Sequence, residues 1–430
     1  MHNLALTLSD MGHKVTGSDD EIYEPSRTRL QKAGLLPDTF GWYPQKIHRG
    51  LDAVILGMHA KPDNPELAKA VELGVKIYSY PEYVAHVTAG QQCVVIAGSH
   101  GKTTTTAMIM HVLSKYDIDY DYLVGAQLEG FDRMVRLSGA PIVILEGDEY
   151  LSSPIDRRPK IMHYQPNIAV ITGVAWDHIN VFPTYDIYED QFRQFITGMG
   201  ADTTLYYFAD DTSLQKIISE QGHQCTVIPY EAIDYDGPVA TSEGKSYRLN
   251  VIGYHNMQNL SAAHQVCRQL RLSSAQFYTG IEDFKGAAKR LQYRGARGSY
   301  RVFQDFAHAP SKVQATTSAV KDWFGKEKLY AFLELHTFSS LNAEFLPLYK
   351  GALDKADVVY IVYDDHTLQM KGMPPLDPGF VREQFGRDDI NVLTENKLVQ
   401  ATVTDLPKDG NLLMMSSGTF GGLQWDQLVD

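Results

Sequence analysis

The sequence predicts an α/β protein of three successive units, in which buried strands alternate with helices. The first observation is an apolar run at residues 93–97, which leads through a glycine-containing loop into an amphipathic stretch ending at residue 113. The second is a pair of apolar runs, 141–145 and 167–172, each followed by acidic residues. The third is that strand-like and helical patterns alternate again from residue 300 onward.

The length of 430 residues allows several domains, at about 100–200 residues each. The elements group into three expected domains, residues 1–90, 91–293 and 294–430. A Gly/Arg-rich stretch at residues 291–298, LQYRGARG, is the expected linker between the second and the third.

In the first domain, helical and strand patterns alternate in a Rossmann-like order. Helices are expected at residues 3–11, 26–33 and 65–73, and strands at residues 13–18, 53–57 and 75–78. Such a domain normally begins with a strand and a glycine-rich loop, whereas this sequence begins with a helix. We therefore expect that this strand and its loop are missing from the sequence, so that either the true start lies upstream or substrate binding is impaired.

The turn Gly17-Ser18-Asp19 follows the expected strand at residues 13–18. Ser18 and Asp19 offer a hydroxyl and a carboxylate, which suit a ribose or a uracil-type base. A polar turn with an acidic cap explains the same residues and, taken alone, is the favoured interpretation.

The second domain begins with a strand, loop and helix of the phosphate-binding type. Glycines let the loop backbone curl so that its N–H groups converge on a phosphate, and the following helix adds its positive N-terminal end. Lys102 can reach a terminal phosphate, and the Thr103 hydroxyl stands where it would ligate Mg²⁺. Because Ile96 occupies the place of the first glycine of the full pattern, this is the shorter GxxGKT variant. The candidate phosphate-binding residues are Gly98, Ser99, His100, Gly101, Lys102, Thr103 and Thr104.

Two polar groups follow the next apolar strands. Glu146 ends the run at residues 141–145, and His178 follows the run at residues 167–172. Both are expected at the sheet edge where α/β proteins bind ligands, near the phosphates. A solvated acid or a helix-capping histidine explains each of them singly, but their joint position favours a functional role.

A helix is expected from Gly253-Tyr254-His255-Asn256 onward, with Asn259 one turn further. The side-chain amides of Asn256 and Asn259 could face a heterocycle, although an asparagine helix cap is the simpler explanation.

The third domain alternates strands and helices again. Strands are expected at residues 300–303, 329–333, 358–362 and 412–415, and a helix at residues 311–324. The first strand runs into Asp305-Phe306-Ala307-His308-Ala309-Pro310, and the second into Glu334-Leu335-His336-Thr337-Phe338-Ser339-Ser340.

Composition excludes several classes of protein. A net charge of -13 argues against a nucleic-acid surface, which needs a basic patch. No apolar run approaches the ~20 residues of a membrane span, and the N-terminus has no signal-peptide pattern. Cys93, Cys225 and Cys267 are far apart and lie in apolar or helical contexts, which indicates buried thiols of a cytoplasmic protein.

The motifs GSHGKTTTT, EGDEY, WDH, GYHNMQN and DFAHAP occur in this order along the chain, which resembles the Mur ligase family. Members join an amino acid or peptide to a UDP-N-acetylmuramoyl acceptor while ATP is converted to ADP and phosphate. The resemblance implies a three-domain Mur ligase architecture in which the domains bind the UDP end, ATP and the incoming amine, in chain order.

The resemblance also implies roles for individual residues. Lys102 would bind the ATP phosphates, and Thr103, Glu146 and His178 would hold Mg²⁺. The adenine and the rest of the nucleotide would be contacted by His255, Asn256, Asn259, Arg290, Asp305 and His308. The UDP-substrate candidates are Ser18, Asp19, His59 and Asn64.

Several members carry a carbamylated lysine after the histidine that corresponds to His178, but this chain has no lysine between Lys160 and Lys216. That pattern fits the L-alanine-adding ligase and a recycling relative that attaches a tripeptide. Residues 156–164, DRRPKIMHY, resemble the recycling enzyme's Asp-x-Arg-x-Lys…His-Tyr pattern. Residues 334–342, ELHTFSSLN, differ from the arginine-containing loops of both.

We therefore expect an ATP-dependent ligase of peptidoglycan recycling. It would join L-Ala-γ-D-Glu-meso-diaminopimelate to UDP-N-acetylmuramate through an acyl phosphate. The alternatives are a UDP-N-acetylmuramate:L-alanine ligase and a non-catalytic protein that binds UDP-sugars or nucleotides. The complete set of phosphoryl-transfer groups disfavours the last.

Overall fold

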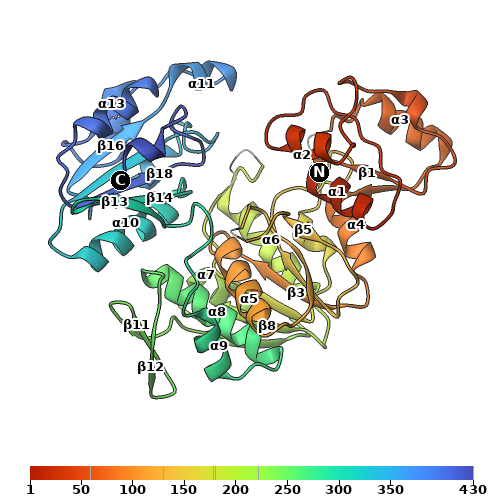
Figure 1. Cartoon of the computed structure of the whole chain (residues 1–430), viewed down its shortest axis with the longest axis horizontal. Helices are drawn as coiled ribbons and strands as arrows, with labels where there is room; N and C mark the ends of the chain where they lie inside the picture. The colour runs from red at the N-terminus through yellow and green to blue at the C-terminus, as the bar shows by residue number, and fades with distance from the viewer. Residues whose placement is uncertain (59, 129, 178, 180, 221, 430) are drawn as a thin grey trace. The chain divides into compact units, whose positions relative to one another are not determined.

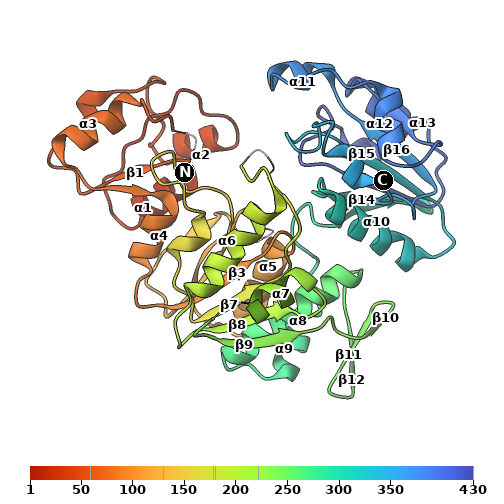
Figure 2. The same ribbon diagram turned by 180° about the vertical axis from the view of Figure 1, so that it is seen from behind.

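The computed structural model describes every residue except 59, 129, 178, 180, 221 and 430 (Figures 1 and 2). The chain divides into two compact units. Unit 1 comprises Met1–Gly98, Leu113–Thr172 and Glu189–Pro229, and unit 2 comprises Ser99–Val112, Gly173–Tyr188 and Tyr230–Asp430. The α/β class is confirmed, and the expected domain boundaries at residues 90 and 293 stay a prediction.

Unit 1 is built on a seven-stranded sheet of order β5-β4-β6-β3-β7-β8-β9. Its strands are β3 (Gln92–Ala97), β4 (Tyr120–Leu123), β5 (Val135–Arg136), β6 (Ile142–Glu146), β7 (Ile168–Ile171), β8 (Thr204–Phe208) and β9 (Thr226–Tyr230). The central strand β3 pairs in parallel with β6 and β7. Residues 93–97 of β3 are all buried, because both faces of a parallel sheet are covered.

Helices α4 (Tyr80–Val87) and α7 (Thr212–Glu220) and a 3₁₀ turn, η2 (Lys160–His163), belong to the same unit as this sheet (Figures 1 and 2). Two further helices, α5 (Lys102–Lys115) and α6 (Tyr185–Thr197), begin in unit 2 and end in unit 1.

The first residues of unit 1 form a small layer beside β5. It contains α1 (His2–Asp10), α2 (Ser26–Lys32), η1 (Pro44–Lys46), β1 (Val54–Leu56), α3 (Pro65–Leu73) and β2 (Ile77–Ser79). Leu4 and Leu8 of α1 pack against Val135 and Leu137, and the Thr7 hydroxyl donates to the Val135 carbonyl at 3.0 Å. β1 and β2 pair in parallel as a two-stranded sheet.

The expected strand at residues 13–18 is wrong. These residues have an alternating pattern but form no strand, because no neighbouring strand pairs with them. Lys46 Nζ instead donates to the Gly17 carbonyl and the Ser18 hydroxyl, each at 3.2 Å.

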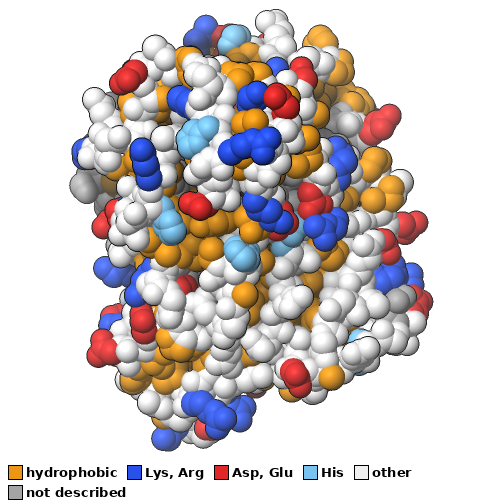
Figure 3. Space-filling model, turned by 90° about the vertical axis from the view of Figure 1, so that its right-hand side faces the viewer, with side chains coloured by type: hydrophobic (Ala, Val, Ile, Leu, Met, Phe, Trp, Pro, Cys, Tyr) orange, Lys and Arg blue, Asp and Glu red, His pale blue; other side chains and the backbone are white. Residues whose placement is uncertain are grey.

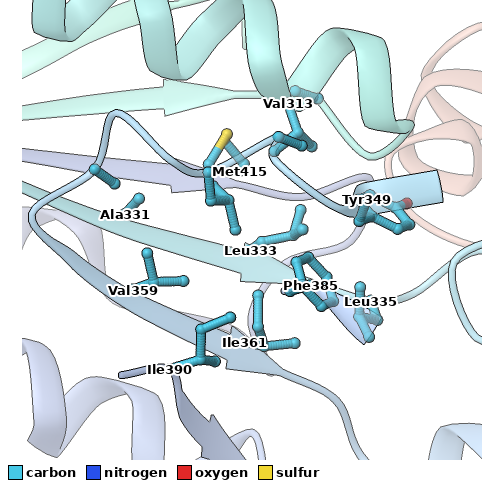
Figure 4. Packing of buried hydrophobic residues seen from close by; sticks show 14 of the residues in the cluster. Val313, Ala331, Leu333, Leu335, Tyr349, Val359, Ile361, Phe385, Ile390 and Met415 are labelled. Atoms are coloured by element: carbon cyan, nitrogen blue, oxygen red, sulfur yellow. The ribbon is translucent and has the colours of Figure 1, made fainter. Parts of the chain in front are cut away.

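Unit 2 contains a six-stranded sheet of order β13-β14-β18-β15-β16-β17, in which only the β13–β14 pair is antiparallel. The strands are β13 (Gln292–Arg297), β14 (Tyr300–Asp305), β15 (Leu329–Glu334), β16 (Val358–Val362), β17 (Asn391–Leu393) and β18 (Asn411–Met415). Alternate residues of β15 face opposite sides: Ala331 and Leu333 join a core that includes Val313 of α10 (Pro310–Phe324), as Figure 4 shows. Tyr330 and Phe332 join a second core on the other face.

The remaining helices of unit 2 complete these layers. They are α8 (Tyr254–Gln269), α9 (Ser274–Ile281), η3 (Leu346–Tyr349), α11 (Asp365–Met370), α12 (Pro378–Gln384), α13 (Lys397–Asp405) and η4 (Trp425–Gln427). A small antiparallel sheet is formed by β10 (Tyr235–Asp236), β11 (Val239–Ser242) and β12 (Lys245–Arg248).

The expected linker at residues 291–298 is a second wrong prediction, because most of it forms strand β13. Gly295 lies at a register shift against β14, with φ +142°. A Cβ at Gly295 would lie 3.0 Å from Val429 Cβ, so the glycine serves a bulge and a close contact rather than a flexible joint.

The described surface agrees with the composition. On the face shown in Figure 3, Lys and Arg side chains are interspersed with Asp and Glu. In the described part of the chain, every helix is too short or too polar to cross a membrane. All three cysteines are buried free thiols, as expected.

Candidate functional site

The phosphate-binding loop has the backbone that its glycines predict. Gly98 has φ +120° and Gly101 has φ +78°, values that residues with a Cβ rarely adopt. Helix α5 begins at Lys102, directly after the second of these glycines. The strand, loop and helix predicted at residues 93–113 are therefore confirmed.

Ser99 fixes this loop to residues 173–188. Its N–H donates to the Gly173 carbonyl at 2.9 Å, and its hydroxyl lies 2.7 Å from the Tyr188 hydroxyl. The same hydroxyl accepts the Ala175 N–H at 2.8 Å. These three contacts of Ser99 within the protein therefore hold the loop in place.

Helix α8 carries the predicted asparagines and contacts α5. Asn259 Oδ1 accepts the Thr105 hydroxyl at 3.3 Å, and Asn256 Nδ2 donates to the Ile252 carbonyl at 2.8 Å. Both asparagines are buried. The structure thus gives them positions next to the phosphate-binding helix, and their contact with adenine stays a prediction.

His255 lies in the first turn of α8, and its ring lies next to the tightly packed Gly253. Gly253 has φ +89°, and a Cβ there would lie 2.3 Å from Ala319 Cβ and 3.2 Å from the His255 ring. Burial lowers the pKa of His255 to about 4, so the imidazole is neutral near pH 7. Gly253 is therefore what allows α8 and α10 to approach each other.

The segment at residues 289–291 is fastened to the DFAHAP turn. Asp305, which is buried, accepts the N–H groups of Leu291 and Ala307, each at 2.5 Å. Burial raises the pKa of Asp305, against the opposing effect of Arg290. The Arg290 guanidinium lies 4.8 Å from the centroid of the Phe306 ring.

The predicted residues Arg290 and Asp305 are thus brought together within unit 2. Their neighbours Lys289 and Leu291 have φ of +56° and +45°, an uncommon backbone for residues with side chains. Asp305 is one of the groups that hold this strained segment in place.

His308 lies beside two residues that sequence reasoning did not assign to the site. Its Nδ1 lies 2.8 Å from the Phe306 carbonyl, and its Nε2 lies 4.0 Å from Asp177 Oδ2. The same Asp177 oxygen is 2.7 Å from Lys312 Nζ. Burial lowers the pKa of His308 to about 4, and the positive charge of Lys312 acts in the same direction. The signal available in the sequence was a lysine two residues after the proline of DFAHAP.

In unit 1, Glu146 ends β6 at the same sheet edge where β3 ends at Ala97. Its Oε2 accepts the Gly125 N–H at 2.7 Å. His178 lies outside the described residues. Among the residues that the structure does describe, no group of three or more His, Cys, Asp or Glu side chains is arranged to hold a metal ion.

The UDP-substrate candidates also lie in unit 1. The Ser18 hydroxyl accepts from Lys46, and Asp19 forms an isolated bridge with Gly41. Desolvation raises the pKa of Asp19. Asn64 is buried and caps α3, with Oδ1 accepting the N–H groups of Glu66 and Leu67. His59 lies outside the described residues.

Residues 148–164 of unit 1 form a segment, here called the DRRPK segment, that is held by its own ion pairs. Asp156 accepts Arg158 Nε at 3.0 Å and a terminal guanidinium nitrogen at 2.7 Å, which lowers the pKa of Asp156. His163 Nε2 lies 3.3 Å from the same carboxylate, and Lys160 Nζ lies 2.6 Å from Asp148 Oδ2. The charges of Asp156 and Arg158, and those of Lys160 and Asp148, are therefore paired within the segment, whereas burial lowers the pKa of His163.

Comparison with known proteins identifies the family. "Mur ligase family, catalytic domain" matches residues 1–92, and "Mur ligase middle domain" matches residues 96–267. The chain belongs to the Mur ligase family. Its members are ATP-dependent ligases that form amide bonds, and this chain is such an enzyme.

Relatives that are similar over nearly the whole chain include proteins named for two different reactions. The chain is 25% identical to the UDP-N-acetylmuramate–L-alanyl-γ-D-glutamyl-meso-2,6-diaminoheptandioate ligase of Haemophilus influenzae, over 98% of this chain and 95% of that one. It is 26% identical to the UDP-N-acetylmuramate–L-alanine ligase of Roseiflexus castenholzii, over 96% of this chain and 91% of that one. The crystal structure of a murein peptide ligase from Psychrobacter arcticus shares the fold, with a TM-score of 0.69 at 22% identity over 100% of this chain and 95% of that one.

Proposed function

We propose that this Mur ligase joins the tripeptide L-Ala-γ-D-Glu-meso-diaminopimelate to UDP-N-acetylmuramate in the cytoplasm, using ATP. The acceptor carboxylate does not react with an amine at neutral pH. Transfer of the terminal phosphoryl group of ATP to that carboxylate gives an acyl phosphate, which the amine then attacks with loss of phosphate.

The P-loop of this chain supplies the groups for the first step. The backbone of residues 98–101 cradles phosphate oxygens, and Lys102 stabilises the charge that accumulates on them. The buried Thr103 and Thr104 are the first hydroxyls of the helix that follows. His255, Asn256 and Asn259 of α8 lie on the adenine side of the proposed site.

Magnesium fits the donors that the proposal assigns to it. The Thr103 hydroxyl and the Glu146 carboxylate are hard oxygen ligands of the kind Mg²⁺ prefers, and His178 is the third assigned ligand. When bound, the ion would neutralise charge on the phosphate oxygens. Glu146 already holds the Gly125 N–H with one oxygen, so its carboxylate is oriented by the protein.

The observation that carries the choice of amine is the DRRPK segment. Asp156, Arg158, Lys160 and His163 match the Asp-x-Arg-x-Lys…His-Tyr pattern of the recycling enzyme. Asp156, Arg158 and Lys160 take part in ion pairs of that segment, and His163 Nε2 lies 3.3 Å from the Asp156 carboxylate. Arg158 is 63% exposed, but its partner Asp156 is only 20% exposed and Lys160 is 24% exposed. A solvated charged face would leave all of these groups in water, so the two partly buried charges support a structural role for the segment. We propose that the DRRPK segment adapts the enzyme to a peptide amine.

L-Alanine is the second candidate, because relatives of both kinds are equally similar. The loop that follows β15 does not favour the tripeptide over L-alanine. Its Thr337 and Ser340 bond each other, with Thr337 N–H to Ser340 Oγ at 2.9 Å and Ser340 N–H to Thr337 Oγ1 at 3.0 Å. Asn342 Oδ1 accepts the Glu344 N–H. These groups hold the loop's own shape.

Competition between the two amines tests the proposal. Purified enzyme is given UDP-N-acetylmuramate, ATP and Mg²⁺ with equal concentrations of tripeptide and L-alanine, and both products are quantified. We expect a higher kcat/KM for the tripeptide, and the opposite ratio would establish the alanine reaction instead.

A variant pair links that ratio to the DRRPK segment. Asp156→Asn should lower kcat/KM for the tripeptide more than for L-alanine, because it weakens the pairing with Arg158 and His163. Asp119→Asn, in the exposed ion pair with Arg136 of the same unit, is the matched control and should change neither value. Equal losses for both amines in Asp156→Asn would show that the segment does not select the amine.

A further inference from the structure

Lys312 stands where a lysine is electrostatically unfavourable. It is the third residue of α10, whose N-cap Ala309 has no side-chain cap bond. A cation is disfavoured at the positive end of a helix unless an anion lies beside it. Asp177 is that anion, 2.7 Å from Lys312 Nζ, and the two side chains are only 16% and 7% exposed.

The charge of Lys312 also acts on the phosphate-binding loop. Burial lowers the pKa of His100 to about 4, and the next two causes are the positive charges of Lys312 and of Lys102. All three residues belong to unit 2. Hydrogen bonds also link the loop to the segment that holds Asp177: the Ser99 N–H donates to the Gly173 carbonyl at 2.9 Å, and the Ala175 N–H donates to the Ser99 hydroxyl at 2.8 Å.

We propose that Lys312 is a second phosphate-binding cation, held by Asp177 without nucleotide and transferred to terminal phosphate oxygens when ATP binds. The inference rests on the ATP site proposed above. Taking a lysine and a carboxylate out of water is costly, and each needs a partner. The terminal phosphate carries more negative charge than Asp177, so it competes effectively for Lys312.

A purely structural pair would behave differently. If the ion pair only fastened α10 to residues 173–188, losing either partner would have the same effect on every nucleotide. If Lys312 binds the terminal phosphate, the two partners have opposite effects, because Asp177 competes with ATP for the lysine.

Calorimetric titration with a non-hydrolysable ATP analogue and with ADP distinguishes these cases. A charged hydrogen bond is worth about 10- to 100-fold in affinity, so Lys312→Met should weaken analogue binding by that factor and ADP binding by less. Asp177→Asn should bind the analogue as tightly as wild type or more tightly. Lys321→Met, on the same helix and paired with Asp357 at 2.6 Å, is the control and should bind both nucleotides as wild type does.

The double variant Lys312→Met/Asp177→Asn guards against a folding defect, because it leaves no buried carboxylate without its lysine. It should still bind the analogue 10- to 100-fold more weakly than wild type. Wild-type affinity in the double variant, or equal weakening of both nucleotides in both single variants, would overturn the proposal. Failure of the proposed ATP site itself would give a different result. Either the wild-type protein would not bind the analogue, or Lys102→Ala would bind it with unchanged affinity.

Discussion

Replacing Gly253 with alanine tests how closely α8 packs against α10. The residue has φ +89° and ψ 149°, a backbone region that is essentially limited to glycine, and the strain should cost about 1–3 kcal/mol. The new Cβ would lie 2.3 Å from Ala319 Cβ, which adds an overpacking cost of about 1–3 kcal/mol. We therefore expect Gly253→Ala to destabilise unit 2 by about 2–6 kcal/mol.

Urea unfolding followed by tryptophan fluorescence measures this cost, because Trp176, Trp323 and Trp425 belong to unit 2. Gly372→Ala is the matched control: its φ is +64°, but a Cβ there meets nothing within 4 Å, so only about 1–2 kcal/mol is expected. Adding Ala319→Gly to Gly253→Ala should recover the steric part, once the cost of Ala319→Gly alone is subtracted. If Gly253→Ala costs no more than Gly372→Ala, the packing argument is refuted.

Three further predictions concern the active site and its pH response. Lys102→Ala should lower phosphate release by at least ~100-fold while the thermal midpoint stays within a few degrees of wild type, and retained turnover would contradict the ATP-site assignment. Glu146→Gln, which keeps an acceptor for the Gly125 N–H, should raise the Mg²⁺ concentration needed for half-maximal rate; an unchanged titration would exclude Glu146 as a ligand. His100, His255 and His308 have pKa values of about 4 in the folded protein, below the 6.5 of an exposed histidine. The unfolded chain therefore binds more protons than the folded protein between pH 6.5 and 4. The free energy of unfolding should fall with decreasing pH by up to about 1.4 kcal/mol per pH unit for each histidine. Stability independent of pH across that window would show that these rings are not buried in the neutral form.

Local sequence patterns were sufficient to predict elements whose residues lie close together in the sequence. The central strand, its loop and α5 follow from an apolar run, two glycines and a helical pattern within about 20 residues. The expected strands at residues 141–145 and 167–172 likewise correspond to β6 and β7. Each is a continuous buried run, which is typical of parallel strands covered on both faces.

Prediction failed at two segments, for two different reasons. Residues 13–18 have a strand-like pattern, but a strand exists only when another segment pairs with it. Residues 291–298 have the composition of a linker, yet β13 pairs with β14 across a two-residue turn at Gly298 and Ser299, with Arg297 opposite Tyr300. Here the partner is the next segment of the chain, and the glycines that suggested a linker serve the hairpin turn and the bulge instead.

The same reasoning applies to the candidate site. The motif residues Lys102, Asn259 and Asp305 could be proposed because their spacing is local and their chemistry is specific. The pair formed by Asp177 and Lys312 was not predicted, because 135 residues separate the partners, although Asp177 lies in the WDH motif and Lys312 follows DFAHAP. Only the fold brings them together.

The motif side chains also have a structural use that their sequence pattern does not reveal. Asn259 holds Thr105 of the helix that begins with Lys102, and Asp305 holds the backbone N–H groups of Leu291 and of Ala307. A buried acceptor that loses its donor, or a donor that loses its acceptor, costs about 1–3 kcal/mol. Alanine substitutions at these positions would therefore disturb the site's geometry together with any ligand contact. An isosteric change such as Asn259→Asp retains the acceptor for Thr105 and removes the amide hydrogens, but it also places an ionisable carboxyl group at a buried position. The ligand roles of the motif residues are consequently best separated from their positioning roles by exchanging donors for acceptors, not by truncating side chains.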